Sequence, residues 1–201
     1  MADPEDTRDV YETQAAVYDT QRSRTMFEAR WLARFTSVLP KSGRVLDLGC
    51  GTGEPIARWF IAEGFRVTGV DFAEAMLTFA EDRWPNGDWR QADMRTLDLG
   101  ETFDGIIAWD SFFHLTQDEQ RDCLVRMAAH LNPGGSMLVT VGPDAGEATG
   151  TVGTRQVFHA SLSPAGYATV LEDNGLRLTG FLAEDPETEC RTVLMARKQE
   201  T

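Results

Sequence analysis

The sequence has few of the features that mark secreted, membrane-bound or metal-binding proteins. Its 201 residues include three cysteines, Cys50, Cys123 and Cys190, which are scattered and show no paired spacing. This pattern argues against a disulfide framework and against a zinc site. The N-terminal stretch has no apolar core of the kind found in signal peptides, and no apolar run approaches the length of a membrane span. We therefore expect a cytoplasmic protein that has no metal site and no membrane partner.

Positive charge is also scarce. The chain has 19 Lys and Arg residues against 32 Asp and Glu residues, which gives a formal net charge of -13. Such a balance argues against nucleic acid as the main partner, because the phosphate backbone is bound by basic surfaces. The length and the hydrophobic content of 42% suit a single globular domain over residues 1–201.

The sequence is organised around the segment VLDLGCGTGE, residues 45–54. Its apolar start predicts a buried strand, and glycines at alternate positions predict a tight turn that leads into a helix. Glycine allows a positive φ and lets backbone N–H groups come close to a ligand. An ordinary strand–turn–helix connection would use the same residues.

The spacing Asp47-x-Gly49-x-Gly51-x-Gly53 resembles motif I of the class I S-adenosylmethionine-dependent methyltransferases. The dinucleotide-binding fingerprint is the main alternative, but Glu54 stands where that pattern has its third glycine. Later segments strengthen the resemblance. LNPGGSMLVTV, residues 131–141, is similar to the turn and fifth strand of this family.

The rest of the chain alternates between strand and helix patterns, which predicts a parallel sheet covered on both faces. The resemblance implies an α/β fold, Rossmann-like and doubly wound. Its sheet would be mostly parallel and seven-stranded, with one antiparallel strand and helices on both faces, and an N-terminal helical lid would lie over the cofactor. Two helices over residues 1–40 would form the lid and residues 41–201 the core. We expect residues 142–153 to form a loop. The expected strands lie near residues 45–48, 65–71, 88–92, 103–110, 136–142, 176–182 and 191–197.

Several candidate ligands of the methyl donor follow predicted strands. By resemblance, Asp71 accepts hydrogen bonds from both ribose hydroxyls, and Asp93 and the Met94 backbone meet the adenine ring. Asp71 as a helix N-cap is the structural alternative. In full, the resemblance implies that S-adenosyl-L-methionine is bound by Tyr11, Tyr18, Asp47, Gly49, Cys50, Gly51, Gly53, Asp71, Phe72, Met76, Asp93, Met94 and Trp109.

Two histidines are candidates for catalysis. His114 follows the fourth strand and His159 follows the expected loop, and a neutral imidazole can take a proton from an acceptor near neutral pH. Each could instead serve only in packing or backbone hydrogen bonding. The segment after the fourth strand is WDSF, residues 109–112, rather than the Asn/Asp-Pro-Pro-Tyr step of amino-group methylases of nucleic acids and of protein glutamine.

Together these features predict transfer of a methyl group to a small-molecule acceptor by in-line displacement. S-adenosyl-L-homocysteine would be the second product, and the chain would act as a monomer or homodimer. The alternative is a sensor or partner module that binds S-adenosylmethionine without catalysis, and which would lack an accessible acceptor cavity. A dinucleotide oxidoreductase is disfavoured by the glycine spacing.

The ribose assignment gives a first prediction. Asp71→Ala should weaken binding of S-adenosylhomocysteine by at least about tenfold, because charge-assisted hydrogen bonds are lost. Isothermal titration calorimetry measures this change directly. Unchanged affinity would contradict the assignment of Asp71.

Overall fold

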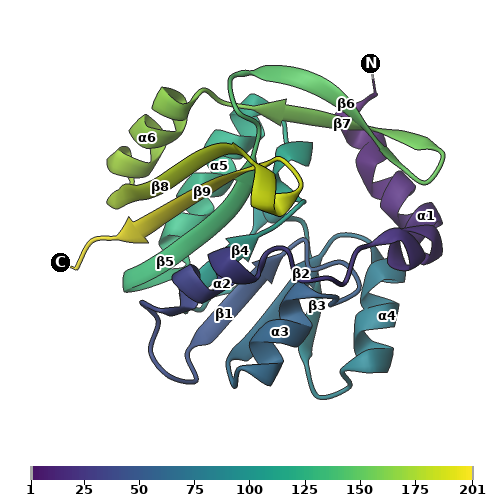
Figure 1. Ribbon diagram of the computed structural model, residues 1–201, viewed down its shortest axis with the longest axis horizontal. Coiled ribbons are helices and arrows are strands. Elements are labelled where there is room, and N and C mark those ends of the chain that lie inside the picture. Colours follow the sequence, from purple (N-terminus) through teal and green to yellow (C-terminus); the bar gives the residue numbers. More distant parts are fainter. Residues whose placement is uncertain (1, 201) are drawn as a thin grey trace.

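The computed structural model describes residues 2–200. These residues form a large sheet flanked by helices and a separate two-stranded hairpin (Figure 1). The main elements in chain order are α1 (Thr7–Gln21), α2 (Ala29–Thr36), β1 (Arg44–Leu48), α3 (Ile56–Ala62), β2 (Arg66–Asp71), α4 (Glu74–Arg83), β3 (Asp88–Gln91), β4 (Phe103–Ala108), α5 (Gln117–Ala129), β5 (Leu131–Val141), β6 (Gly146–Val152), β7 (Arg155–Ser161), α6 (Pro164–Asp173), β8 (Leu176–Asp185) and β9 (Arg191–Lys198). The short 3-10 turns are η1 (Pro4–Asp6), η2 (Met94–Thr96), η3 (Phe112–His114) and η4 (Pro186–Thr188).

The seven strands of the large sheet lie in the order β3-β2-β1-β4-β5-β9-β8. Strands β1 to β5 pair in parallel, and β9 runs antiparallel to both β5 and β8. The predicted fold class is confirmed, including the single antiparallel strand. The strand order reverses between β1 and β4, so the crevice beyond their carboxyl ends is where such sheets bind ligands.

The two faces of the sheet are covered by different helices because side chains alternate along each strand. Val45 in β1 packs with α2 and α3, together with Ile107 and Leu138 of the neighbouring strands. Leu46, the next residue of β1, belongs to a second cluster that includes side chains of α5 and α6. This alternation fixes the register of the central strands, because a shift by one residue would exchange the two faces.

Residues 142–153 were expected to be a loop, and that expectation is wrong for most of the segment. Strand β6 pairs antiparallel with β7. Gly146 lies opposite Ser161 at one end of the hairpin and Val152 opposite Arg155 at the other, and Gly153 has a positive φ of 57° in the turn. The side chains of β6 are mostly exposed, so the strand gives no apolar periodicity. Its hydrogen bonds to β7 provide the order that a local pattern does not indicate.

The two predicted N-terminal helices are confirmed as α1 and α2. Helix α1 lies beside α4 on one side and beside the β6–β7 hairpin on the other (Figure 1). At the hairpin turn Gly153 lies against Gln14 of α1, and Arg155 forms an ion pair with Asp9 at 3.4 Å. None of the helices among residues 2–200 has the length and apolar character needed to cross a membrane.

The core contacts predict a clear stability difference. Phe35 of α2 is fully buried and packs edge-to-face on Phe60, with ring centroids 5.8 Å apart. Phe35→Ala should lower the free energy of unfolding by about 3–5 kcal/mol, whereas Val125→Ala on an exposed surface should change it by less than about 0.5 kcal/mol. Chemical denaturation of both variants measures the difference, and equal values would contradict this packing.

Candidate active site

The glycine turn after β1 has the backbone conformation that its sequence predicts. Gly49, Gly51 and Gly53 have φ values of 73°, 53° and 75°, which favour glycine. A Cβ added to Gly49 would lie 2.3 Å from the Cβ of Ser111, whose hydroxyl donates to the Leu48 carbonyl at 2.7 Å. The turn therefore packs closely against the segment that follows β4.

Asp71 at the end of β2 connects this turn to the next helix. Its Oδ2 accepts from the Gly51 N–H and its Oδ1 from the Ala73 N–H, both at 2.9 Å. Burial raises the pKa of Asp71 to about 6, although the backbone donors oppose the shift. A carboxylate has about four lone-pair sites, so each oxygen can accept one further hydrogen bond. Asp71 thus has a structural role, and it can also bind a vicinal diol.

A crevice of about 780 Å³, its open mouth included, lies beyond these strand ends. The structure brings most of the predicted cofactor ligands together along it. Those that line the crevice are Tyr11, Tyr18, Gly49, Gly51, Asp71, Phe72, Met76, Asp93 and Met94. The first turn of the chain also contributes, through Pro4, Glu5, Thr7 and Arg8, which the sequence did not indicate.

Four predicted ligands lie behind this lining. Gly53 packs against Trp84 and Trp89, and Cys50 is buried beneath the turn. Trp109 is 5% exposed, and its indole belongs to the core cluster of α2 and α3. The assignments of these side chains to the cofactor stay predictions. Their positions favour roles in supporting the turn.

Asp47 is the fourth of these residues, and it has an unusual environment. It is 3% exposed, and its Oδ2 has no hydrogen-bond partner among residues 2–200. Burial and then the nearby Asp71 raise the pKa of Asp47 to about 7, while Arg22 opposes the shift. A buried carboxylate of this kind stabilises a cationic group that approaches the turn.

The carboxylate of Asp93 is already engaged by its neighbour. It accepts from the Arg95 backbone N–H at 2.8 Å and pairs with the Arg95 guanidinium at 2.7 Å. It nevertheless lines the crevice, as does Met94. The predicted contact of Asp93 with an adenine amino group would use the lone pairs that Arg95 leaves free.

His114 has both ring nitrogens occupied. Nδ1 lies 3.0 Å from the Phe158 carbonyl, and Nε2 lies 2.7 Å from the Tyr11 hydroxyl. Because a carbonyl only accepts, Nδ1 carries the proton and Nε2 accepts from Tyr11. Burial lowers the pKa of His114 to about 3, so the ring is neutral at physiological pH. The side chain orients the Tyr11 hydroxyl and has no free lone pair for an external proton.

His159 of β7 has a different environment. Its ring packs at an angle against those of Phe113 and His114, with centroids 4.5 and 4.9 Å away, and makes no hydrogen bond with the residues that the structure describes. Burial lowers its pKa, partly opposed by Asp110. Gly150 makes room for the ring, because a Cβ there would lie 2.3 Å from it. His159 is therefore a neutral imidazole with a free lone pair.

A second and larger cavity, of about 1900 Å³ with its open mouth, adjoins the crevice. It is lined by both strands of the β6–β7 hairpin, by the end of β5 and by the start of β9, and His159 lies in its wall. The two cavities share four lining residues, which mark the junction between them: Tyr11, Tyr18, Asp110 and His114.

Asp110 is a site residue that the sequence analysis did not select, although it noted the strand end where it lies. Its φ of 55° is unusual for a residue other than glycine. The carboxylate forms a bidentate pair with Arg191 at 2.8 and 2.9 Å. Arg22 and Arg191 both stack on the Phe27 ring, with guanidinium carbons 5.3 and 4.6 Å from its centroid. This cluster ties the segment between α1 and α2 to the carboxyl edge of the sheet.

Comparison with known proteins gives consistent matches. Residues 45–135 match a family model described as a methyltransferase domain. The chain is 37% identical over 103 residues to a dTDP-4-amino-2,3,4,6-tetradeoxy-D-glucose N,N-dimethyltransferase of Saccharopolyspora spinosa, covering 50% of this chain and 41% of that protein. It is 36% identical over 143 residues to the cypemycin N-terminal methyltransferase of a Streptomyces species. This match covers 68% of this chain and 56% of that protein.

Among solved structures, SAM-bound CalS10, an amino pentose methyltransferase from Micromonospora echinaspora, matches with a TM-score of 0.74 and 22% identity. The match covers 93% of this chain and 96% of CalS10, so the two share a fold. The chain spans about half the length of the curated relatives it matches.

The buried carboxylate of Asp47 gives a prediction about stability. Its pKa is about 7 in the folded protein against 3.8 for a free side chain, so the folded state keeps a proton that the unfolded state loses between about pH 4 and 7. The contribution of Asp47 to stability therefore falls as the pH rises through this window. Above pH 7, Asp47→Asn should raise the free energy of unfolding by at least about 1 kcal/mol.

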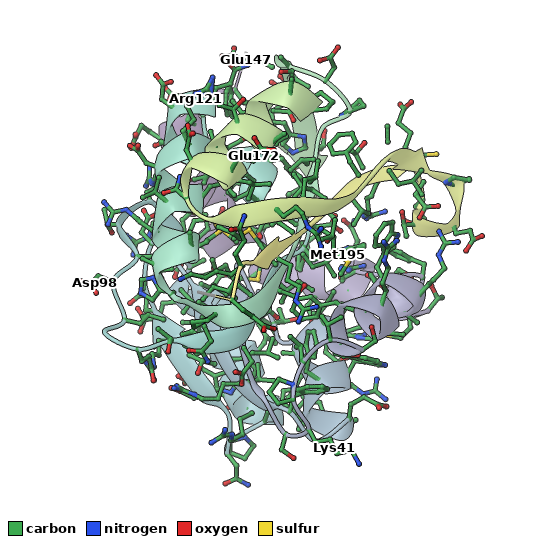
Figure 2. All side chains as sticks on the ribbon, turned by 90° about the vertical axis from the view of Figure 1, so that its left-hand side faces the viewer. Lys41, Asp98, Arg121, Glu147, Glu172 and Met195 are labelled. Carbon is green, nitrogen blue, oxygen red and sulfur yellow. The ribbon has the colours of Figure 1, made fainter. Side chains whose placement is uncertain are left out.

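Urea denaturation at pH 5 and pH 8 measures this effect. Asp98→Asn, at an exposed position, is the matched control (Figure 2). The prediction is wrong if Asp47→Asn and the control give the same change at both pH values.

Proposed function

We propose that this chain, which carries a class I S-adenosylmethionine-dependent methyltransferase domain, transfers a methyl group from S-adenosylmethionine to a small-molecule acceptor. The main support is the junction of the two cavities at Tyr11, Tyr18, Asp110 and His114. A module that only senses the cofactor needs the narrow crevice and has no use for a large adjoining cavity.

The residues along the crevice fit the methyl donor. Asp71 offers two carboxylate oxygens to the ribose diol, and Phe72 and Met76 offer apolar contacts to the base. Gly51 leaves the backbone open toward the ligand, since a Cβ there would meet only Tyr18, at 3.6 Å. Negative charge from Asp47 and Asp71 favours the cationic end of the donor.

When bound, S-adenosylmethionine supplies a methyl group that is already attached to a good leaving group. The protein then has to align the acceptor atom with the methyl group and keep water out. Helix α1 and the β6–β7 hairpin close over the junction and can do both. In this proposal α1 acts as the lid, whereas α2, the second helix of the expected lid over residues 1–40, packs on the sheet beside α3.

Of the two predicted catalytic histidines, His159 is the better candidate for the general base. Its imidazole is neutral, lines the larger cavity and has a free lone pair. His114 has no such lone pair, because Tyr11 donates to it. We therefore assign to His114 the orientation of Tyr11.

The comparisons support a small acceptor, because the Saccharopolyspora spinosa relative is named for an amino sugar. The acceptor cavity here is formed by the hairpin and by segments of the sheet edge. Among the described residues, its lining contains two guanidinium groups, those of Arg22 and Arg191, and both are paired with carboxylates, whereas a nucleic acid is bound by clustered basic side chains.

Calorimetry tests the first half of this proposal. We expect S-adenosylmethionine and S-adenosylhomocysteine to bind and NAD to show no heat of binding. Labelled methyl donor, incubated with a panel of small amines, alcohols and thiols, tests the second half. Binding without transfer to any compound would favour the sensor alternative, and binding of NAD alone would overturn the proposal.

His159→Ala should slow methyl transfer by at least about tenfold and leave the affinity for S-adenosylhomocysteine within twofold, because a base contributes only to the chemical step. His130→Ala is the matched control, since His130 lies at the end of α5 and bonds to the Leu99 N–H, away from both cavities. Full activity of His159→Ala would remove this side chain from catalysis.

A further inference from the structure

The larger cavity carries an excess of negative charge. Its lining includes five carboxylates and two guanidinium groups: Asp110, Asp144, Glu147, Glu184 and Glu189, with Arg22 and Arg191. Both guanidinium groups are already paired. Arg191 binds Asp110 and Glu189, and Arg22 binds Glu28, which is fully buried.

The other three carboxylates, those of Asp144, Glu147 and Glu184, form no ion pair within the described part of the chain. They lie at exposed positions on the segments that border the cavity, and Figure 2 shows Glu147 at one end of the molecule. Their uncompensated charge creates a negative potential at the entrance, which raises the local concentration of cations and lowers that of anions. The electrostatics therefore favour a positively charged acceptor.

The Tyr11 hydroxyl gives a second and independent constraint. Its proton is donated to Nε2 of His114, because Nδ1 of that ring donates to the Phe158 carbonyl. At the junction of the cavities, the phenol oxygen can therefore offer only lone pairs to a ligand. It selects an acceptor atom that carries a hydrogen to donate.

The His159 imidazole gives a third constraint on the acceptor. It lies in the wall of the same cavity, with its ring centroid 4.9 Å from that of His114, which in turn bonds to Tyr11. Tyr11 and His159 thus line the same cavity, and His159 has a ring nitrogen that is free to take a proton. A positively charged group that must lose a proton before it can react is an ammonium.

We propose that the methylated atom is the nitrogen of a small, phosphate-free amine, which enters as its ammonium ion, loses a proton to His159 and is oriented by the Tyr11 oxygen. This inference rests on the proposed function. The ammonium N–H bond breaks and its proton goes to the imidazole. The nitrogen lone pair then forms the N–C bond, the C–S bond breaks with its electron pair to sulfur, and the neutral thioether and a methylated ammonium result.

The absence of phosphate follows from the pairing of the cavity's arginines. A nucleoside diphosphate carries at least two negative charges and is bound by free guanidinium, ammonium or backbone N–H groups. Here both guanidinium groups are neutralised by carboxylates, and the remaining charge is repulsive. The amine acceptor of this chain therefore differs from the dTDP-linked amino sugar after which the Saccharopolyspora spinosa relative is named.

Sinefungin provides a test that needs no knowledge of the acceptor. This analogue of the methyl donor carries a primary amine in place of the methylsulfonium group, so it presents an ammonium at the junction. By calorimetry, the unmodified protein should bind sinefungin at least about tenfold more tightly than S-adenosylhomocysteine. The ratio of the affinity for sinefungin to that for S-adenosylhomocysteine should fall at least threefold in Tyr11→Phe. It should fall by the same factor in the triple variant Asp144→Asn, Glu147→Gln, Glu184→Gln.

The three carboxylates of the triple variant are exposed and line only the larger cavity, so its affinity for S-adenosylhomocysteine should stay within twofold. Equal affinity for the two ligands in the unmodified protein would overturn the amine assignment. So would an advantage for sinefungin that neither variant reduces.

Matched sugars test the acceptor class itself. Protein saturated with S-adenosylhomocysteine is dialysed against labelled D-glucosamine, D-glucose or D-glucosamine 6-phosphate. We expect glucosamine to be retained at least about fivefold more than either of the others, and the preference to disappear in the triple variant. Retention without preference for glucosamine, or no retention of any sugar, overturns the proposal.

These results separate the two levels of inference. Binding of S-adenosylhomocysteine together with methyl transfer to an alcohol or a thiol would leave the proposed function standing and remove the amine. Failure to bind S-adenosylhomocysteine at all would remove both.

Discussion

The site depends on one buried carboxylate. Asp71 accepts hydrogen bonds from Gly51 in the turn after β1 and from Ala73 at the start of α4, so a single side chain sets the distance between two loops. Without these bonds the two backbone N–H groups would be buried and unpaired, which is costly. The same residue lines the crevice, and each of its oxygens can accept a further hydrogen bond. The group that organises the turn is therefore also the one that can bind the ligand.

This arrangement has an energetic cost. Burial raises the pKa values of both Asp47 and Asp71, and the nearby Asp71 carboxylate raises that of Asp47 further. The two carboxylates beside the turn are therefore not fully compensated by positive charge in the ligand-free protein. Functional sites commonly retain such unfavourable groups because they interact with a ligand, and replacing them stabilises the protein at the expense of activity.

The sequence predicted those parts of the site that depend on local order. A strand end, a glycine turn and a helix start lie within about ten residues, so the positions of Gly49, Gly51 and Asp71 follow from the pattern and from the edge of a parallel sheet. The hairpin and the Asp110–Arg191 pair did not follow. β6 has no apolar face, and Asp110 meets a residue 81 positions away along the chain. Only tertiary structure brings these groups together.

The two histidines illustrate the same limit in chemical terms. In the sequence His114 and His159 were equal candidates for a base, since both follow predicted structural elements and both imidazoles can take a proton. The difference arises from contacts that are 103 and 44 residues distant: Tyr11 donates to His114, and the Phe158 carbonyl fixes its tautomer. His159, which follows Phe158 in β7, receives neither contact. The fold thus gives one ring a structural task and leaves the lone pair of the other free in the cavity wall.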